Sequence, residues 1–215
     1  MKYEFTGEKK EYHGVLHRIR AVRDFGNVKA GDLGGWIESI SNLSQEGNAW
    51  VGGDAIVCGN AVVSDDACVY DNARVYGNAV VSNNARVYDN ARVYGNAVVS
   101  NNAMVYGNSV VPDDACVYDN ARVYGNASIS NDARVYDNAR VYGNAIVSDD
   151  ACVYGTSRVY NDACVYGNSR VYDNARVYDT SRVYGNAVVS GTAEVFGRAV
   201  VEGDKVISEG RIIGK

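Results

Sequence analysis

The sequence predicts an all-β fold, a parallel β-helix shaped as a triangular prism of about nine coils. Three observations predict it. First, a Val or Ile stands at every sixth residue from Val51 to Ile213, 28 times without exception, and a strict short period indicates one unit stacked on itself. Second, the residue two places earlier is Ala or Ser from Ala49 to Ala199. Third, serines such as Ser64 interrupt the Tyr column 18 residues apart, so three six-residue sides make one coil.

Each six-residue unit reads as a short strand followed by a corner. In the unit that begins at Ala73, alternation along an extended strand turns Ala73 and Val75 to one side and Arg74 and Tyr76 to the other. The Val and Ala columns are uniform and apolar, so we place them inside, while the mixed Arg and Tyr columns face water. The Gly-Asn pair that ends the unit suits a corner, because these residues tolerate positive φ.

The two ends of the chain depart from the period. Residues 1–46 lack it and are expected to form a small N-terminal β cap, in which Trp36 could close the first triangular opening. Repeats follow over residues 47–204. Residues 205–215, where Lys205 and Arg211 break the Ala column, are expected to form a C-terminal cap. Such caps are needed because stacked strands leave an open edge at each end.

The spacing of an aliphatic residue and an Ala or Ser four places later, as in Val75 and Ala79, resembles the hexapeptide repeat of left-handed parallel β-helix proteins. The resemblance implies the left hand of the coil. Many members are acyltransferases, and the fold hosts several activities. The leader from Leu16 to Ser44, including Gly31-Asp32-Leu33-Gly34-Gly35-Trp36, is similar to YdcK-like hexapeptide proteins. These are usually labelled uncharacterised acetyltransferases and often occur in phages and prophages, so the resemblance implies a phage or viral protein.

Composition narrows the class of protein. There is no signal peptide and no long apolar run, which predicts a cytoplasmic protein (in the host cytoplasm if phage encoded) without a membrane partner. The five cysteines are odd in number and lack paired metal spacing, so we expect reduced thiols. Residues 1–46 hold seven basic and seven acidic residues, which leaves 14 basic against 19 acidic residues for the rest. This balance argues against nucleic-acid binding.

Catalysis has few candidates. Acyltransferases of this fold generally use a histidine as general base, yet the only two histidines, His13 and His17, lie in the cap and none lies in the repeats. They are weak catalytic candidates, and coenzyme A is expected as a cofactor only if the protein is an acyltransferase. The acid pairs at the corners, such as Asp65-Asp66, read as turn residues, so no metal site is expected.

One outward face carries an aromatic column that is unbroken over eight coils, with four consecutive arginines beside it. Guanidinium forks and ring stacking could together hold an anionic ligand. The alternative is that Tyr favours strands, Arg keeps the surface soluble and corner Asp residues balance the charge. The residues predicted to bind ligand are Arg122, Tyr124, Arg140, Tyr142, Arg158, Tyr160, Arg176 and Tyr178.

Flat apolar strips on the other two faces predict self-association, because β-branched residues beside small serines let another prism approach closely. The predicted interface residues are Val62, Val80, Val98, Val110 and Ile146. The habit of the resembled family favours a trimer. The alternative is that these valines reflect strand propensity alone.

Three functions remain open from the sequence. The first is a non-catalytic oligomeric scaffold or binding protein that captures an anionic, nucleotide-like small molecule or a host protein between subunits. The second is an acyl-coenzyme A-dependent acyltransferase. The third is a structural spacer. The absence of histidines and of inserted loops from the repeats favours the first.

Overall fold

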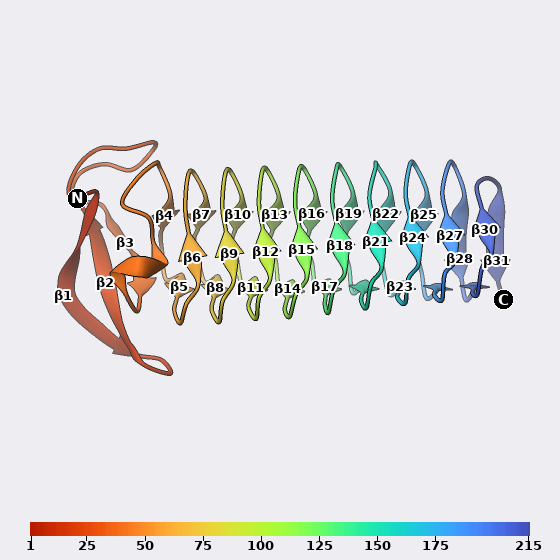
Figure 1. Ribbon diagram of the computed structural model, residues 1–215, viewed down its shortest axis with the longest axis horizontal. Helices are drawn as coiled ribbons and strands as arrows, with labels where there is room; N and C mark the ends of the chain where they lie inside the picture. Colours follow the sequence, from red (N-terminus) through yellow and green to blue (C-terminus); the bar gives the residue numbers. More distant parts are fainter.

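The computed structural model describes all residues from 1 to 215 and shows an elongated prism with an N-terminal cap (Figure 1). The cap contains β1 (Tyr3–Glu11), β2 (Val15–Ala21), β3 (Leu33–Ile37) and a 3-10 turn, η1 (Ile40–Asn42). β1 pairs with β2, and β2 with β3, in antiparallel fashion. No helix in the structure is long and apolar enough to cross a bilayer.

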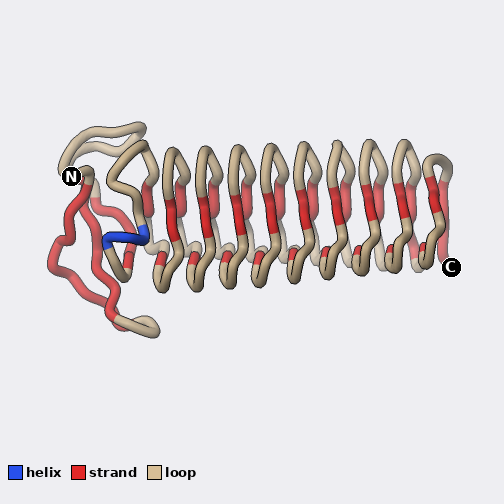
Figure 2. Tube along the Cα trace, viewed as in Figure 1, coloured by secondary structure: helices blue, strands red, loops and turns tan.

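Three parallel sheets form the sides of the prism (Figure 2). Within the repeats each strand pairs with the strand 18 residues away, whereas the last strand pairs 17 residues away, Val195 with Ile212. The first face consists of β4 (Trp50–Val51), β7 (Cys68–Val69), β10 (Arg86–Val87), β13 (Met104–Val105), β16 (Arg122–Val123), β19 (Arg140–Val141), β22 (Arg158–Val159), β25 (Arg176–Val177), β28 (Glu194–Gly197) and β31 (Arg211–Gly214).

The second face consists of β5 (Ile56–Val57), β8 (Arg74–Val75), β11 (Arg92–Val93), β14 (Val110–Val111), β17 (Ser128–Ile129), β20 (Ile146–Val147), β23 (Cys164–Val165), β26 (Arg182–Val183) and β29 (Val200–Val201). The third face consists of β6 (Val62–Val63), β9 (Val80–Val81), β12 (Val98–Val99), β15 (Cys116–Val117), β18 (Arg134–Val135), β21 (Cys152–Val153), β24 (Arg170–Val171), β27 (Val188–Val189) and β30 (Val206–Ile207). The predicted triangular parallel β-helix is confirmed.

The coil begins earlier than the repeat does. β3 pairs in parallel with β5, and Leu43 forms a parallel bridge with Val63. Residues 33–51 therefore build one coil without the six-residue period, beneath the nine predicted coils. The stack has about ten turns in all, because one coil of the solenoid lies inside the segment that we predicted as cap.

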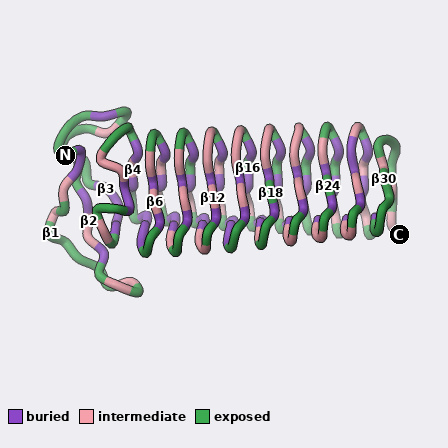
Figure 3. The backbone as a smooth tube through the Cα atoms, viewed as in Figure 1, coloured by how far each residue is buried: buried purple, intermediate pink, exposed green.

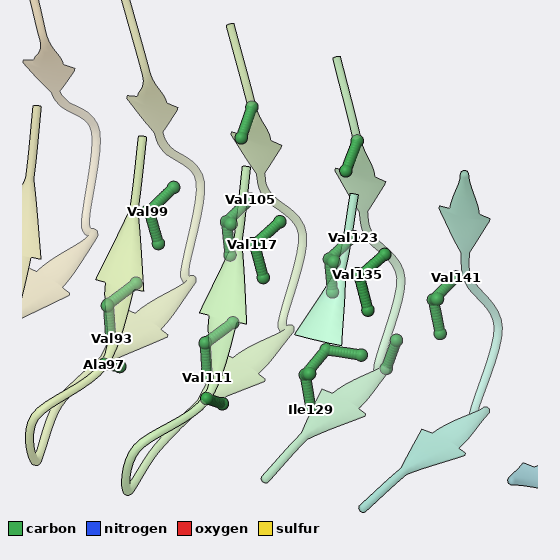
Figure 4. Packing of buried hydrophobic residues seen from close by; sticks show 14 of the residues in the cluster. Val93, Ala97, Val99, Val105, Val111, Val117, Val123, Ile129, Val135 and Val141 are labelled. Atoms are coloured by element: carbon green, nitrogen blue, oxygen red, sulfur yellow. The ribbon is translucent and has the colours of Figure 1, made fainter. Parts of the chain in front are cut away.

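The interior consists of the two predicted columns. Val and Ala side chains from Ala49 to Val195 form one continuous cluster with 0 % exposure at every repeat position (Figures 3 and 4). Four serines replace Ala in this column, and each hydroxyl donates to a nearby carbonyl, as Ser109 Oγ does to Tyr106 O at 2.9 Å. A buried hydroxyl needs such a partner, so the column tolerates Ser without loss of packing.

Most corners satisfy their backbone in the same way. The first corner residue has positive φ, for example 75° at Gly77, 59° at Asp89 and 60° at Asn101. These are the residue types that adopt this conformation at low cost. The second corner residue donates its backbone N–H to the next coil, as Asn78 N does to Gly95 O at 2.7 Å. The backbone N–H and C=O groups of these corners are thus hydrogen-bonded between coils, although they lie outside the short strands.

The cap closes the prism with residues other than the one that we expected. Register pairs Trp36 with the outward Ile56 and Ile37 with the inward Val57, so Trp36 lies outside the prism. It joins a small cluster with Leu16 under the β1–β2 hairpin. The prediction that Trp36 closes the first opening is therefore wrong. Ile37 packs into the main core instead, together with Tyr3, Ile19 and Leu43.

Replacing Ala127 with Leu tests the packed interior. Ala127 is fully buried, so the larger side chain has no room, and we expect a loss of about 1–3 kcal/mol or more in the free energy of unfolding. The matched control is Ser128→Leu, one residue further along and facing outward. Denaturant unfolding of both variants measures the difference, and equal losses would show that the inside and outside have been reversed.

Candidate functional site

The first face carries a continuous stack of aromatic rings. Eight rings, from Tyr70 to Phe196, lie one per coil, with neighbouring centroids 4.7–5.0 Å apart and interplanar angles of 1–6°. The spacing follows from strand pairing, which sets adjacent chains roughly 4.8 Å apart. The rings therefore form a flat apolar band along the prism axis.

A row of arginines runs beside this band on the same strands. β16, β19, β22 and β25 place Arg122, Arg140, Arg158 and Arg176 in direct register. Arg176 forms an ion pair with Glu194 at 3.3 Å, whereas the other three, all exposed, form no ion pair and no side-chain hydrogen bond. Like charges at strand spacing repel by roughly 1 kcal/mol in water, so the row favours an anion above it.

The corner carboxylates do not pair with this row. Asp137 Oδ2 accepts the backbone N–H of Gly155 at 3.1 Å, and Asp173 Oδ2 accepts that of Gly191 at 3.1 Å. These acids are thus occupied with the next coil along the axis. No corner Asp forms an ion pair with an arginine of the row, and balancing of its charge by these acids at longer range stays the alternative. The structure also contains no cluster of side chains suited to a metal ion.

Burial within the stacks raises the pKa of tyrosine side chains. It raises the pKa of Tyr88 to about 12, and the neighbouring rings Tyr106 and Tyr70 add to the shift because each disfavours a second phenolate nearby. On the third face, burial and the neighbours Cys152 and Tyr154 raise the pKa of Tyr136 to about 12. Tyr88 and Tyr136 are therefore neutral hydrogen-bonding groups near pH 7.

The aromatic columns on the other faces are shorter. The third face stacks four rings from Tyr118 to Tyr172, and the second face has only the pairs Tyr76–Tyr94 and Tyr166–Tyr184. The predicted interface residues lie where the columns are interrupted. Val62, Val80 and Val98 stand in register on the third face, and Val110 and Ile146 on the second, with Ile146 43 % exposed.

The two histidines do not come together. His17, in β2, stacks on Phe5 with centroids 4.6 Å apart. His13 lies in the turn between β1 and β2 with φ of 52°, and Tyr12 packs against it edge to face at 4.9 Å. Of the two, only His13 borders a hollow, which is lined by Tyr12, His13, Glu38, Cys58, Gly59, Tyr76 and Gly77.

A second hollow, of about 510 Å³, lies at the cap end of the first face. Its lining comprises Gly26, Asn27, Val28, Asn48, Trp50, Asp66, Cys68, Tyr70, Asn84 and Arg86. Sequence reasoning missed this site, although one signal was present: Gly52 stands in the Tyr column where the next ring would be. The cap loop that overhangs it has no repeat signature.

Comparison with known proteins agrees with this architecture. The model of the YdcK β-solenoid repeat matches residues 67–83, 85–101, 115–131, 133–149 and 139–155. The chain is also 44 % identical over 63 residues to "Uncharacterized acetyltransferase YdcK" of Escherichia coli (strain K12). That match covers 29 % of this chain and 19 % of the relative, so the chain aligns with about a fifth of the relative's length.

Alkaline titration tests the stacks. The pKa of Tyr88 and Tyr136 is about 12 in the folded protein but about 10 in an unfolded chain. Their contribution to stability is therefore present below pH 10 and is lost as pH rises toward 12. Absorbance of phenolate and circular dichroism should report late ionisation together with loss of β structure, while the denatured protein ionises near pH 10. Ionisation of most tyrosines near pH 10 with intact β structure would contradict the stacking.

Proposed function

We propose that this chain, which matches the YdcK β-solenoid repeat over part of its length, is a non-catalytic, oligomeric binding protein that captures an anionic small molecule on its first face. The observation that carries the proposal is the row of Arg122, Arg140 and Arg158 beside an unbroken ring stack, with no acid paired to any of the three. Arginines in repeat proteins are usually solvated, but an uncompensated row on a rigid sheet is costly unless an anion offsets it.

The geometry favours a flat ligand with acidic groups. Each guanidinium is a planar fork that suits a carboxylate or a phosphate. The adjacent rings of Tyr124, Tyr142 and Tyr160 offer a surface on which an apolar or aromatic part can lie. The strands are fixed in register by the core, so binding would require little reordering of the chain.

An acyltransferase is the second candidate, because the E. coli relative is named as one and His13 borders a hollow. Coenzyme A carries several phosphates, which need cationic partners. Apart from the histidine itself, the only charged side chain in the lining is Glu38, an acid. The residues present therefore do not fit an acyl-coenzyme A donor.

Self-association is part of the proposal. Val62, Val80 and Val98 lie in register on the third face beside Ser64, Ser82 and other small outward residues. Such a flat strip suits the close approach of a second prism, and prisms packed side by side would create clefts between their faces. We favour a trimer, with a host protein as the alternative occupant of those clefts. A structural spacer would need neither the arginine row nor the strip.

Reversal of charge in the row tests the binding function. Arg140→Glu combined with Arg158→Glu should abolish retention of an anionic ligand, seen as extra mass in native mass spectrometry of protein purified gently from cells. The matched control is Arg134→Glu with Arg170→Glu, two exposed arginines of the third face. Retention of the same mass by the first double variant, or no retained mass on the wild-type protein, would refute the proposal.

Introducing one charged side chain into the apolar strip of the third face tests the proposed interface. Val80→Arg should convert the oligomer to a monomer, because a guanidinium on a close-packed strip loses its hydration without gaining a partner. Val188→Arg, on the same face but outside the strip, is the control. Light scattering after gel filtration measures both masses. An unchanged mass for Val80→Arg beside a wild-type oligomer would place the interface elsewhere, and a monomeric wild type would refute self-association.

A further inference from the structure

The aromatic column of the first face stops one coil before the cap. Tyr70 stacks on Tyr88 on one side, but the coil before it places Gly52 at the column position, so no ring follows. The indole of Trp50 leans toward this gap, since a Cβ on Gly52 would meet Trp50 Nε1 at 3.3 Å. The last tyrosine and this indole therefore both border the hollow at the cap end.

The cap supplies a roof for the same hollow. Phe25 and Val28 bridge each other in a tight turn, and Phe25 packs against Trp50 with centroids 5.4 Å apart at 67°. Gly26, Asn27 and Val28 then overhang the face. The turn between β1 and β2 covers the second face beside Tyr76 in a similar way, but there Cys58 occupies the column position, whereas on the first face Gly52 leaves that position without a side chain.

Several polar groups in the hollow have unused hydrogen-bonding capacity. Arg86 forms neither an ion pair nor a side-chain hydrogen bond. The amide of Asn84 has no partner, although that of Asn102, the corresponding residue of the next coil, donates to Asn120 at 3.2 Å. Asp66 uses only Oδ1, which accepts from Asn48 Nδ2 at 2.7 Å, and its other oxygen stays free.

We infer that this hollow is a binding site for a small planar heteroaromatic ring that carries an anionic group. The ligand ring would lie against Trp50 and Tyr70, at the column position where Gly52 leaves no aromatic side chain. Contact between aromatic rings contributes about 0.5–1.5 kcal/mol. Arg86 would take the anionic group in its fork. At the ring edge the Asn84 amide would donate and accept, and the free oxygen of Asp66 would accept.

This site is separate from the row that begins at Arg122, two coils further along. It needs no second subunit, because every group named belongs to one chain. Burial raises the pKa of the Cys68 thiol in its wall, which favours the neutral thiol.

The test uses three matched probes and the fluorescence of Trp50. In a Trp36→Phe background Trp50 is the only tryptophan. AMP carries a heteroaromatic ring and an anion, adenosine the ring alone, and ribose 5-phosphate the anion alone. AMP should quench Trp50 saturably, and each of the other two should bind at least tenfold more weakly. Absence of saturable quenching by AMP, or equal binding of all three, would overturn the site. Equilibrium dialysis of AMP against the wild-type protein replaces fluorescence if the background variant is unstable.

Three variants test this site. Arg86→Met should weaken AMP binding at least tenfold, whereas Arg134→Met, at an exposed arginine of the third face, should leave it unchanged. Gly52→Tyr should abolish binding by placing a ring in the gap. The backbone at Gly52 is outside the left-handed region, and the new Cβ would lie 3.3 Å from Trp50 Nε1, so the indole must shift slightly. Binding unchanged in Arg86→Met, or lost equally in Arg134→Met, would overturn the hollow as the site. Loss in Arg122→Met with none in Arg86→Met would support the row instead.

Discussion

The narrow triangular interior constrains every other feature of this protein. Each coil must fill the same cross-section with about three Val and three Ala side chains, and close-packed interiors tolerate little change in volume. Coils that share one interior also share one backbone path, so their outward residues come into register. The stacked rings, the arginine row and the hydrogen-bonded corners all follow from that register. None of them could exist on coils of variable shape.

The sequence predicted the repeat region well for the same reason. A column with one residue type, such as Val75 and Val81, indicates that the position is buried. Serines replace tyrosines in the outward column at 18-residue intervals, and this interval indicates three six-residue sides per coil. The arginine and tyrosine columns were predicted and found in one face. The cap could not be predicted in this way, because its residues occur once. Trp36 is the example: its bulk suggested a plug, but register with Ile56 placed it outside.

The hollow at the cap end escaped prediction because two unrelated segments form it. Gly52 marks the gap in the sequence, but the loop that covers the gap comes from residues 24–28, and no spacing rule joins the two. The partners of charged side chains were equally hidden. Corner acids such as Asp137 seemed available to neutralise the arginines, whereas Asp137 accepts a backbone N–H from the following coil. The direction of those oxygens depends on the stacking of the coils, which no single corner sequence reveals.

In a solenoid of near-identical units, register alone produces ladders, so a ladder by itself is weak evidence for function. Features that register does not produce are more informative. The arginine row differs from a passive ladder because its charges lack partners while the nearby acids are occupied. The hollow differs more strongly, because there the repeat is interrupted at Gly52 and a non-repeating loop closes over the interruption. Specific recognition requires groups of different chemistry to converge, and a strict repeat offers this only at its ends. The boundary between cap and coil is therefore where selectivity can arise, while the uniform faces provide area and charge.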